Sequence, residues 1–216
     1  MTWNMQGGNK DKYYQIADYM KKHNINIACL QETGTLPKDY AKNPKTINNI
    51  ALNTGDFKTG ASSGMIYTTI NYDNDTGQNN RCSMAILSEP AVLDMWAIPG
   101  PNNLRPLLGI KIPGDIWVYT VHAPSGNPNS ASGVTVSMLD DMPLAQRTKR
   151  WVCAGDYNCP PAQIGGGGRT TVGGLAPTHK NGGMLDYAVT GNIALTHQSQ
   201  GIEPLFSDHW SQIFDF

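Results

Sequence analysis

The chain has 216 residues, with 16 Lys and Arg against 17 Asp and Glu and a formal net charge of -1. This length suits one large domain, so we expect a single catalytic domain over residues 1–216. The nearly balanced charge excludes an overall positive field that would recruit nucleic acid, so such binding must depend on a local patch. No apolar run approaches the ~18 residues that span a bilayer, and the N-terminus lacks the layout of a secretion signal.

The first elements predict a β-α-β unit. Residues 2–8 indicate a strand end followed by a Gly turn, and residues 11–23 have the apolar periodicity of an amphipathic helix. Residues 25–30 indicate a buried strand that ends at Gln31 and Glu32. If the two strands are parallel, Asn4 and Glu32 lie at the same end of neighbouring strands, where sites of α/β proteins collect.

The middle of the chain is rich in predicted strands. These cover residues 64–72 and 81–88, followed by a hairpin of residues 105–112 and 116–122 that ends at His122. Residues 123–133 are rich in Pro, Ser, Asn and Gly, which favours a mobile loop, and residues 134–141 indicate a short helix.

The last third begins with a strand at Trp151 that stops at Gly155. We predict a long flexible loop over residues 160–177, strands over 184–190 and 192–196, and a last strand towards residue 216. Four consecutive glycines at 165–168 could cradle a phosphate, but the Lys-Ser/Thr pair of a P-loop does not follow them.

An acid and an amide follow the Trp151 strand at a spacing of two residues. In extended chain this spacing places the side chains of Asp156 and Asn158 on one face. A carboxylate can hold a hard cation or a water, and a carboxamide can donate to a phosphoryl oxygen, so the pair suits phosphate chemistry. The same four residues also fit an ordinary turn after a strand, and the pair by itself does not decide between the two interpretations.

The four cysteines, at positions 29, 82, 153 and 159, have no spacing that suits a zinc site. Three of them lie in apolar runs, which favours small buried side chains. A disulfide from Cys159 to another strand is the alternative.

Polar residues recur at the predicted strand ends in a particular order. These residues are Asn4, Gln31 and Glu32, His122, Asp156 with Asn158, Asp186, and Asp208 with His209. This order resembles the endonuclease/exonuclease/phosphatase family, which includes deoxyribonuclease I, apurinic-site endonucleases and inositol-polyphosphate phosphatases. Within the family the chain is most similar to the catalytic B subunits of cytolethal distending toxins, through blocks at residues 2–7, 31–37, 80–81, 105–110, 121–123, 154–158 and 182–192.

The resemblance implies an α/β (α+β) fold of four layers, in which two packed β-sheets are flanked by helices and the catalytic residues lie at one rim. It also implies a Mg²⁺-dependent endonuclease of the genotoxin type that cleaves DNA, with Ca²⁺ or Mn²⁺ as substitutes. Partner subunits would deliver such a secreted toxin subunit into target cells, where the nucleus is the expected site of action.

Residue roles follow from the same resemblance. Glu32 is the expected principal Mg²⁺ ligand, with Asn4 and Asp208 in or next to the coordination shell. His209 is the expected general base and Asp186 its orienting acid, while His122 donates to the phosphate or to the leaving oxygen. Asp156 and Asn158 position phosphate and water, and two arginines contact phosphates, at positions 81 and 105.

Other residues define the limits of the resemblance. We expect the remaining histidines, at positions 23, 179 and 197, to lie on the surface or in loops. Deoxyribonuclease I has a glutamate that orients the residue matching His122, whereas residues 65–70 offer no carboxylate. The toxin subunits also look apolar there.

Two alternative functions stay open at this point. One is a phosphoinositide phosphatase of the same family. The other is a catalytically idle binding subunit, against which the complete set of polar residues argues.

Overall fold

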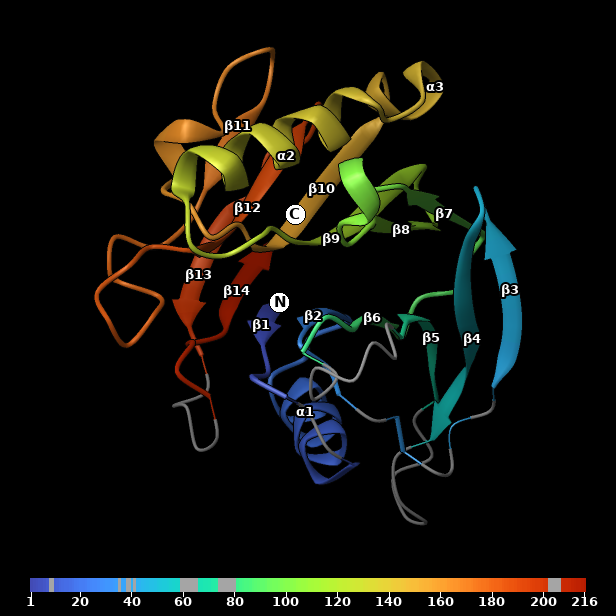
Figure 1. Ribbon diagram of the computed structural model, residues 1–216. Coiled ribbons are helices and arrows are strands. Elements are labelled where there is room, and N and C mark those ends of the chain that lie inside the picture. The colour runs from blue at the N-terminus through green and yellow to red at the C-terminus, as the bar shows by residue number, and fades with distance from the viewer. Residues whose placement is uncertain are drawn as a thin grey trace.

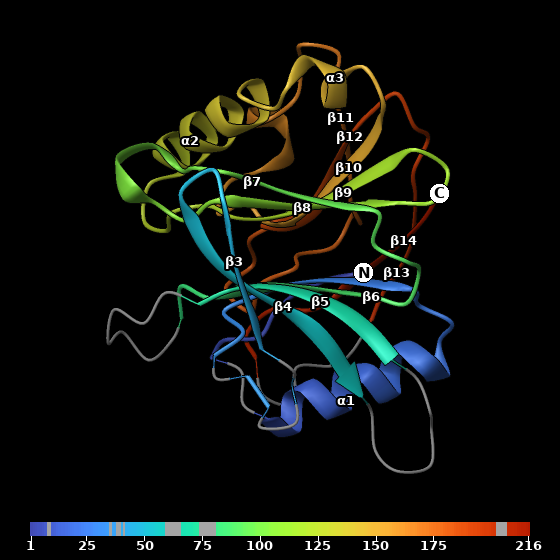
Figure 2. The same cartoon turned by 90° about the vertical axis from the view of Figure 1, so that its right-hand side faces the viewer.

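A computed structural model describes residues 1–7, 10–34, 36–37, 40, 42–58, 66–73, 81–201 and 207–216. Its strands form two sheets that face each other (Figures 1 and 2). The eight-stranded sheet has the order β13-β14-β1-β2-β6-β5-β4-β3. Its strands are β1 (Thr2–Asn4), β2 (Ile27–Gln31), β3 (Asn43–Ile47), β4 (Ile50–Lys58), β5 (Ile66–Tyr72), β6 (Met84–Ser88), β13 (Thr196–Gln200) and β14 (Gln212–Asp215).

The six-stranded sheet has the order β11-β12-β10-β9-β8-β7. Its strands are β7 (Asp94–Ile98), β8 (Leu107–Ile112), β9 (Ile116–His122), β10 (Arg150–Asp156), β11 (Thr170–Val172) and β12 (Asp186–Gly191). The helices are α1 (Lys10–Lys22), α2 (Pro128–Asp140) and α3 (Leu144–Arg147), with two short 3₁₀ turns, η1 (Pro101–Asn103) and η2 (Pro161–Gln163).

Helices cover the outer faces of both sheets. Figure 2 shows α2 and α3 beyond the six-stranded sheet and α1 beyond the eight-stranded sheet. The molecule is therefore the four-layer sandwich that the resemblance implies, and that prediction is confirmed.

Alternation along the strands divides the apolar side chains between the layers. On β2, Ile27 and Cys29 join the cluster between the two sheets, whereas Ala28 and Leu30 join the cluster under α1. Successive side chains of a strand point to opposite faces, so a strand buried on both faces reads as a continuous apolar run. The predicted strand at residues 25–30 has this pattern and is buried on both sides.

The β-α-β prediction places the first two polar positions correctly. Strands β1 and β2 are parallel neighbours, and Asn4 lies opposite Gln31 in the register. Their carboxyl ends therefore meet at one edge of the sheet, with Asn4 next to Glu32. The predicted hairpin is confirmed as well, since β8 and β9 pair antiparallel and β9 ends at His122.

The loop prediction for residues 123–133 is wrong from residue 128 onward. Helix α2 begins at Pro128, and the Asn127 side chain caps it by accepting hydrogen bonds from the backbone N–H groups of Asn129 and Ser130. The Pro and Asn that suggested a loop are also the residues that favour the first turn of a helix.

Other boundaries also differ from the predictions. The predicted loop at 160–177 contains η2 and the edge strand β11, which pairs with β12. The predicted strand at 192–196 is instead β13 at 196–200, and β3, β4 and β7 were not predicted. Positions 8, 35, 64, 65 and 80, which belong to predicted elements or motifs, lie outside the described residues.

The cysteines are free thiols, so the alternative of a disulfide from Cys159 is wrong. Cys29, Cys153 and Cys159 are buried, and the Cys159 sulfur lies 3.7 Å from the Tyr187 hydroxyl. In the part of the chain that the structure describes, none of the helices has the length and apolar character needed to cross a membrane.

Candidate active site

Five strand ends and one loop meet at one rim of the sandwich. In the six-stranded sheet, Asp156 at the end of β10 lies opposite both His122 on β9 and Asp186 on β12. Strands β1 and β2 bring Asn4 and Glu32 to the same place from the other sheet, and the Asn4 side chain donates to Asp156 across the gap, at 2.9 Å. The two sheets therefore contribute to one site.

Close packing of β9 against β10 depends on Gly155. A Cβ atom at this position would overlap the backbone carbonyl of Val121. Glycine therefore permits the parallel strands to approach at the residue before Asp156. The Gly-Asp-x-Asn segment is thus both a strand end and part of the polar cluster, so its two interpretations hold together.

The loop that carries His209 is tied to β1. Ser207 donates through its hydroxyl to the Asn4 carbonyl at 2.7 Å and accepts from the His209 backbone N–H at 3.1 Å. The Trp3 indole N–H donates to the His209 carbonyl at 3.0 Å. These bonds fix His209 beside the strand ends although more than 200 positions separate it from β1 in sequence.

His209 and Asp186 form a hydrogen-bonded pair. The Nδ1 atom of His209 lies 2.8 Å from Asp186 Oδ2, and both side chains are buried. Thr178 donates to the same oxygen at 2.9 Å, and its hydroxyl accepts from the Asp186 backbone N–H. Because Nδ1 carries the proton that Asp186 accepts, Nε2 of neutral His209 is left as the basic atom.

The charges around His209 favour its protonated form. Burial lowers the pKa of His209, but the hydrogen bond and charge of Asp186, with the charges of Asp156 and Asp208, outweigh burial and raise the pKa to about 9. Burial and the neighbouring Asp186 raise the pKa of Asp156, and burial raises the pKa of Asp186. The protonation states of the three groups are therefore linked, and such linked shifts are common where acids and bases act in catalysis.

His122 lies between two carboxylates on the other side of Asp156. Its Nε2 atom is 3.7 Å from Asp156 Oδ2 and 3.8 Å from Glu32 Oε1. Burial, followed by the charges of Arg105, His209 and Arg81, lowers the pKa of His122 well below its usual value. The lowered pKa therefore favours the neutral form of this histidine.

Among the described residues, the other nitrogen of His122 has no orienting group. Nδ1 is buried and has no hydrogen-bond partner among the described residues. This observation agrees with the absence of a carboxylate from the segment at 65–70, of which the structure describes Ile66 onward. Within the described part of the chain, packing rather than a hydrogen bond at Nδ1 therefore holds the ring.

Glu32 is bound by a cation of the chain itself. Arg81 Nε lies 2.6 Å from Glu32 Oε2, and Arg81 Nη2 is 3.4 Å from Oε1. The Glu32 side chain is 9% exposed and that of Arg81 is 52% exposed, so the arginine reaches in from the surface. Arg81 was predicted as a phosphate contact, and in the structure its guanidinium lies against the predicted metal ligand.

The oxygens near Glu32 suit a hard cation. Asp208 Oδ1 is buried and has no hydrogen-bond partner among the described residues, so it has free lone pairs. Asn4 instead turns its NH₂ group towards Glu32 and Asp156, while its oxygen accepts from the Gln6 backbone N–H. Asp208 therefore offers a free carboxylate oxygen of the kind that hard cations prefer, and Asn4 turns a donor rather than an oxygen towards Glu32.

Arg105 and Asn158 both contact the Ala123 carbonyl. Arg105 Nη2 donates to it at 3.1 Å and Asn158 Nδ2 at 2.9 Å. The Asn158 backbone N–H also donates to Asp156 Oδ1 at 2.9 Å. Both side chains therefore lie at the rim next to His122, where a phosphate could be contacted.

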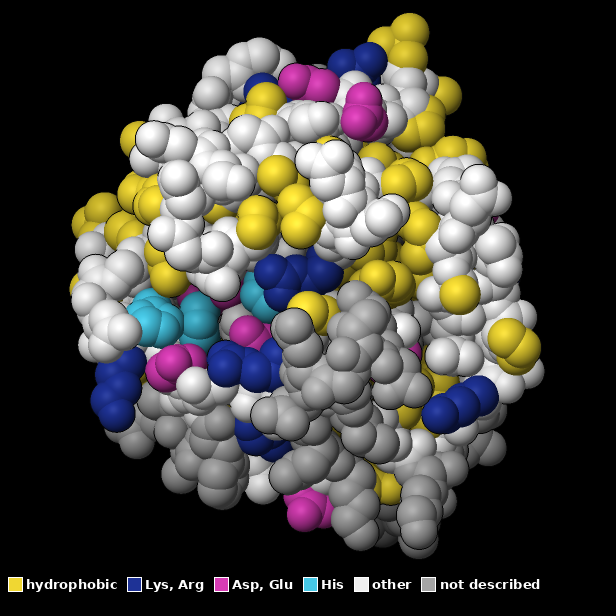
Figure 3. Space-filling model, viewed as in Figure 1, with side chains coloured by type: hydrophobic (Ala, Val, Ile, Leu, Met, Phe, Trp, Pro, Cys, Tyr) yellow, Lys and Arg dark blue, Asp and Glu magenta, His cyan; other side chains and the backbone are white. Residues whose placement is uncertain are grey.

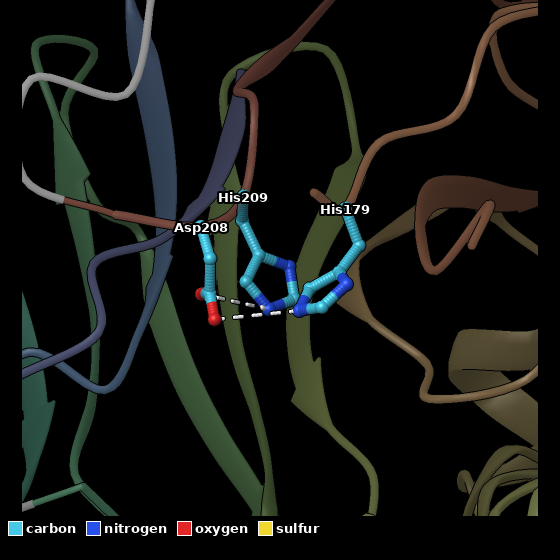
Figure 4. Close-up of side chains that lie close together, drawn as sticks. All are labelled: His179, Asp208 and His209. Carbon is cyan, nitrogen blue, oxygen red and sulfur yellow. Dashed lines mark ion pairs between the residues drawn. The ribbon is translucent and has the colours of Figure 1, made fainter. Parts of the chain in front are cut away.

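His179, like Thr178, lies in the site and was not predicted from the sequence. It lies in a loop, as expected, but its Nε2 atom is 3.4 Å from Asp208 Oδ2 (Figure 4). Its ring lies edge-on to that of His209, with the centroids 4.6 Å apart. The only hint in the sequence was that His179 directly follows Thr178 and precedes Asp186 by seven residues. A single His in a loop rich in Gly, Pro and Asn has no periodic pattern that would place it in the site.

The site opens on one face of the molecule. In Figure 3, histidine side chains gather in a hollow, with acidic side chains among them and Lys or Arg side chains on two sides. Acids and imidazoles within a border of cations suit an anionic substrate, despite the balanced net charge of the chain.

Comparisons with known proteins agree with this geometry. The sequence profile of the Endonuclease/Exonuclease/phosphatase family matches residues 1–209. A Salmonella typhi protein, described as a homolog of the B subunit of cytolethal distending toxin, is 27% identical over 245 aligned positions, which cover 99% of this chain and 87% of that protein.

Two solved structures have the same fold. One is CdtB, described as the biologically active subunit of cytolethal distending toxin, with a TM-score of 0.79, 21% identity, and coverage of 97% of this chain and 93% of that chain. The other is the cytolethal distending toxin of Haemophilus ducreyi, with a TM-score of 0.76, 22% identity, and coverage of 97% and 94%.

Proposed function

The chain belongs to the endonuclease/exonuclease/phosphatase family, is therefore a hydrolase, and from its site we propose that it is a Mg²⁺-dependent endonuclease that hydrolyses DNA phosphodiester bonds. The observation that carries this proposal is the buried Asp186–His209 pair beside the oxygen ligands of the rim. Hydrolysis needs a base for water, a cation on a phosphate oxygen, and donors around phosphorus. Each of these has a candidate in the site.

His209 is the proposed general base. Its Nε2 atom takes a proton from the attacking water, whose oxygen forms the new bond to phosphorus as the bond to the leaving oxygen breaks. Asp186 holds Nδ1–H and stabilises the imidazolium that results, and Thr178 holds Asp186. Because the pKa of His209 is raised to about 9, the basic form increases as the pH rises through 9.

Glu32 and Asp208 are the proposed ligands of the cation, with Asn4 next to them. When bound there, Mg²⁺ polarises a phosphate oxygen and offsets the negative charge that develops in hydrolysis. Oxygen donors favour a hard cation such as Mg²⁺, Mn²⁺ or Ca²⁺.

The remaining residues contact the phosphate. Neutral His122 donates through Nε2, while Asp156 and Asn158 position water and phosphate. Arg81 and Arg105 offer guanidinium groups, which bind phosphates through two hydrogen bonds. The two arginines differ in their contacts, since Arg81 pairs with Glu32 and Arg105 with a backbone carbonyl.

A plasmid-nicking assay with Mg²⁺, run beside phosphate release from a phosphoinositide, tests the reaction. We expect nicking by the wild type, none with a chelator, and none by His209→Ala. Phosphate release from the phosphoinositide without nicking would replace the nuclease by a phosphatase of the same family. The absence of both activities would support an idle binding subunit.

Similarity to toxin subunits supports a further part of the proposal. We infer that partner subunits deliver the chain into target cells, where it damages nuclear DNA. Wild-type protein microinjected into cells should raise DNA-damage markers, whereas His209→Ala should not. The same protein added outside the cells, without partners, should have no effect, and an equal effect from outside would contradict delivery by partner subunits.

A further inference from the structure

His179 contacts the exposed side of Asp208. Its Nε2 atom lies 3.4 Å from Asp208 Oδ2, and Figure 4 shows both histidine rings directed towards this carboxylate. The side chains of His179 and Asp208 are 15% and 31% exposed, so the pair lies at the mouth of the site.

A second contact assigns the proton on the His179 ring. The Asn181 backbone N–H donates to His179 Nδ1 at 3.1 Å. In neutral imidazole, the nitrogen that accepts a hydrogen bond carries no proton, so Nε2 carries it. His179 therefore presents an N–H donor to Asp208.

The backbone holds His179 in this position. His179 and His209 form an antiparallel bridge, in which the Lys180 N–H donates to the Asp208 carbonyl at 2.8 Å and the Trp210 N–H to the Thr178 carbonyl at 2.9 Å. The His179 carbonyl accepts from the Gly182 N–H at 2.9 Å. The imidazole is thus fixed relative to the backbone that carries Asp208.

The two oxygens of Asp208 have different surroundings. Oδ2 faces His179, whereas Oδ1 is buried, has no hydrogen-bond partner among the described residues, and lies 3.7 Å from His209 Nε2. A partly exposed aspartate can rotate, and ordering it on cation binding costs free energy. A donor on Oδ2 turns Oδ1 inward before the cation arrives.

We propose that His179 is a positioning residue, which donates through Nε2–H to Asp208 Oδ2, directs Oδ1 into the site and so raises the affinity for the divalent cation. This inference rests on the proposed role of Asp208 as a ligand of that cation. Ligand atoms of His179, Asp208 and His209 lie within 4.8 Å of one another, a set that could also hold a transition metal. The proton on Nε2 argues against His179 as a ligand, because metal binding there would displace the proton and the Asn181 hydrogen bond.

Manganese binding, followed by electron paramagnetic resonance, tests the positioning role without reference to the substrate. We expect His179→Ala to raise the Mn²⁺ dissociation constant roughly tenfold. This is the lower end of the loss in metal affinity that follows when a residue orienting a metal ligand is removed. The Mg²⁺ concentration for half-maximal nicking should rise in parallel, while kcat at saturating Mg²⁺ stays within about threefold. His179→Gln, whose amide N–H can reach as far as Nε2, should restore binding, whereas the shorter His179→Asn should not.

The controls separate the possible failures. His23→Ala, which removes an exposed imidazole elsewhere, should leave Mn²⁺ binding unchanged, and thermal unfolding of each variant checks the fold. Unchanged binding in His179→Ala would overturn the positioning role, and so would equal losses in His179→Ala and His179→Gln, which would make the ring itself a ligand.

A variant of the proposed ligand separates this role from the ligand assignment. Asp208→Asn should also weaken Mn²⁺ binding. If it does not, both the proposed ligand and the role of His179 are wrong, whereas a loss in Asp208→Asn alone would leave the ligand in place.

Discussion

The two halves of the site differ in how tightly the fold holds them. The proton-handling half, Thr178, Asp186 and His209, is buried and linked by hydrogen bonds of 2.8 and 2.9 Å. The proposed cation half contains the buried Glu32, paired with Arg81 at 2.6 Å, but its other members are more open: the side chains of Arg81 and Asp208 are 52% and 31% exposed, and the histidine contact of Asp208 is 3.4 Å long.

This difference follows from what each half must do. A general base needs one tautomer and one orientation, and the buried, hydrogen-bonded side chains of this half supply both. A cation site must exchange ions and admit a phosphate, which loops at the surface permit. Removing the proposed base should therefore abolish the rate, whereas changing a residue of the proposed cation half should shift the Mg²⁺ dependence.

The largest effect should come from His209. His209→Ala removes the proposed base, and we expect nicking at saturating Mg²⁺ to fall by about 10³-fold or more. Asp186→Asn should cost on the order of 10³-fold by disturbing the tautomer, although its shape is kept. Single-turnover rates with thermal unfolding as a control would measure both, and activity of His209→Ala within tenfold of wild type would rule out this base.

Glu32→Gln should have a smaller effect of a different kind. The substitution keeps the shape but removes the charge, so the Mg²⁺ requirement should rise and the maximal rate should fall by roughly 10- to 100-fold. Titration of nicking against Mg²⁺ distinguishes the two effects. An unchanged Mg²⁺ requirement would place the cation elsewhere in the site.

The two arginines should separate by their contacts. Arg105→Ala should weaken DNA cleavage several-fold and lower the log–log salt slope by roughly one unit, with much less effect on a small soluble phosphodiester. Arg81→Ala should in addition change the Mg²⁺ requirement, because Arg81 pairs with Glu32. Arg147→Ala, an exposed arginine of α3, is the matched control. Equal losses on DNA and the small substrate would place Arg105 at the scissile phosphate.

Strand ends were the part of the site that the sequence could predict. Each of four residues follows a short apolar run that can be recognised in the sequence: Asn4, Glu32, His122 and Asp156. The fold itself came from the family resemblance, because alternation alone does not say which sheet a strand joins. Register brought Asn4 next to Glu32 and Asp156 next to His122, since β1 pairs with β2 and β10 with β9, and the packing of the two sheets joined these pairs.

Contacts made by loops could not be predicted in this way. His179 meets Asp208 through a single antiparallel bridge between two irregular segments, which leaves no periodic signal. Arg81 was predicted to lie in the site, but its pairing with Glu32 was not. The two residues are 49 positions apart in sequence, and their contact depends on how far the arginine side chain extends in the folded chain. The start of α2 was missed because Asn and Pro serve both loops and helix caps.

The smallest predicted effect is a pH dependence of stability that arises in the buried half. The folded-state pKa of His209, about 9, lies above its ordinary value of 6.5, so its contribution to stability is fully present below pH 6.5 and is lost as pH rises through 9. In chelator, the Tm of the wild type should therefore fall by a few degrees more between pH 6.5 and 9 than the Tm of His209→Gln. The raised pKa values of Asp156 and Asp186 act with the same sign but begin to act at lower pH, from their ordinary value of 3.8. Only the slopes of Tm against pH are compared, because the substitution also changes packing, and parallel slopes would contradict a protonated His209 in the folded state.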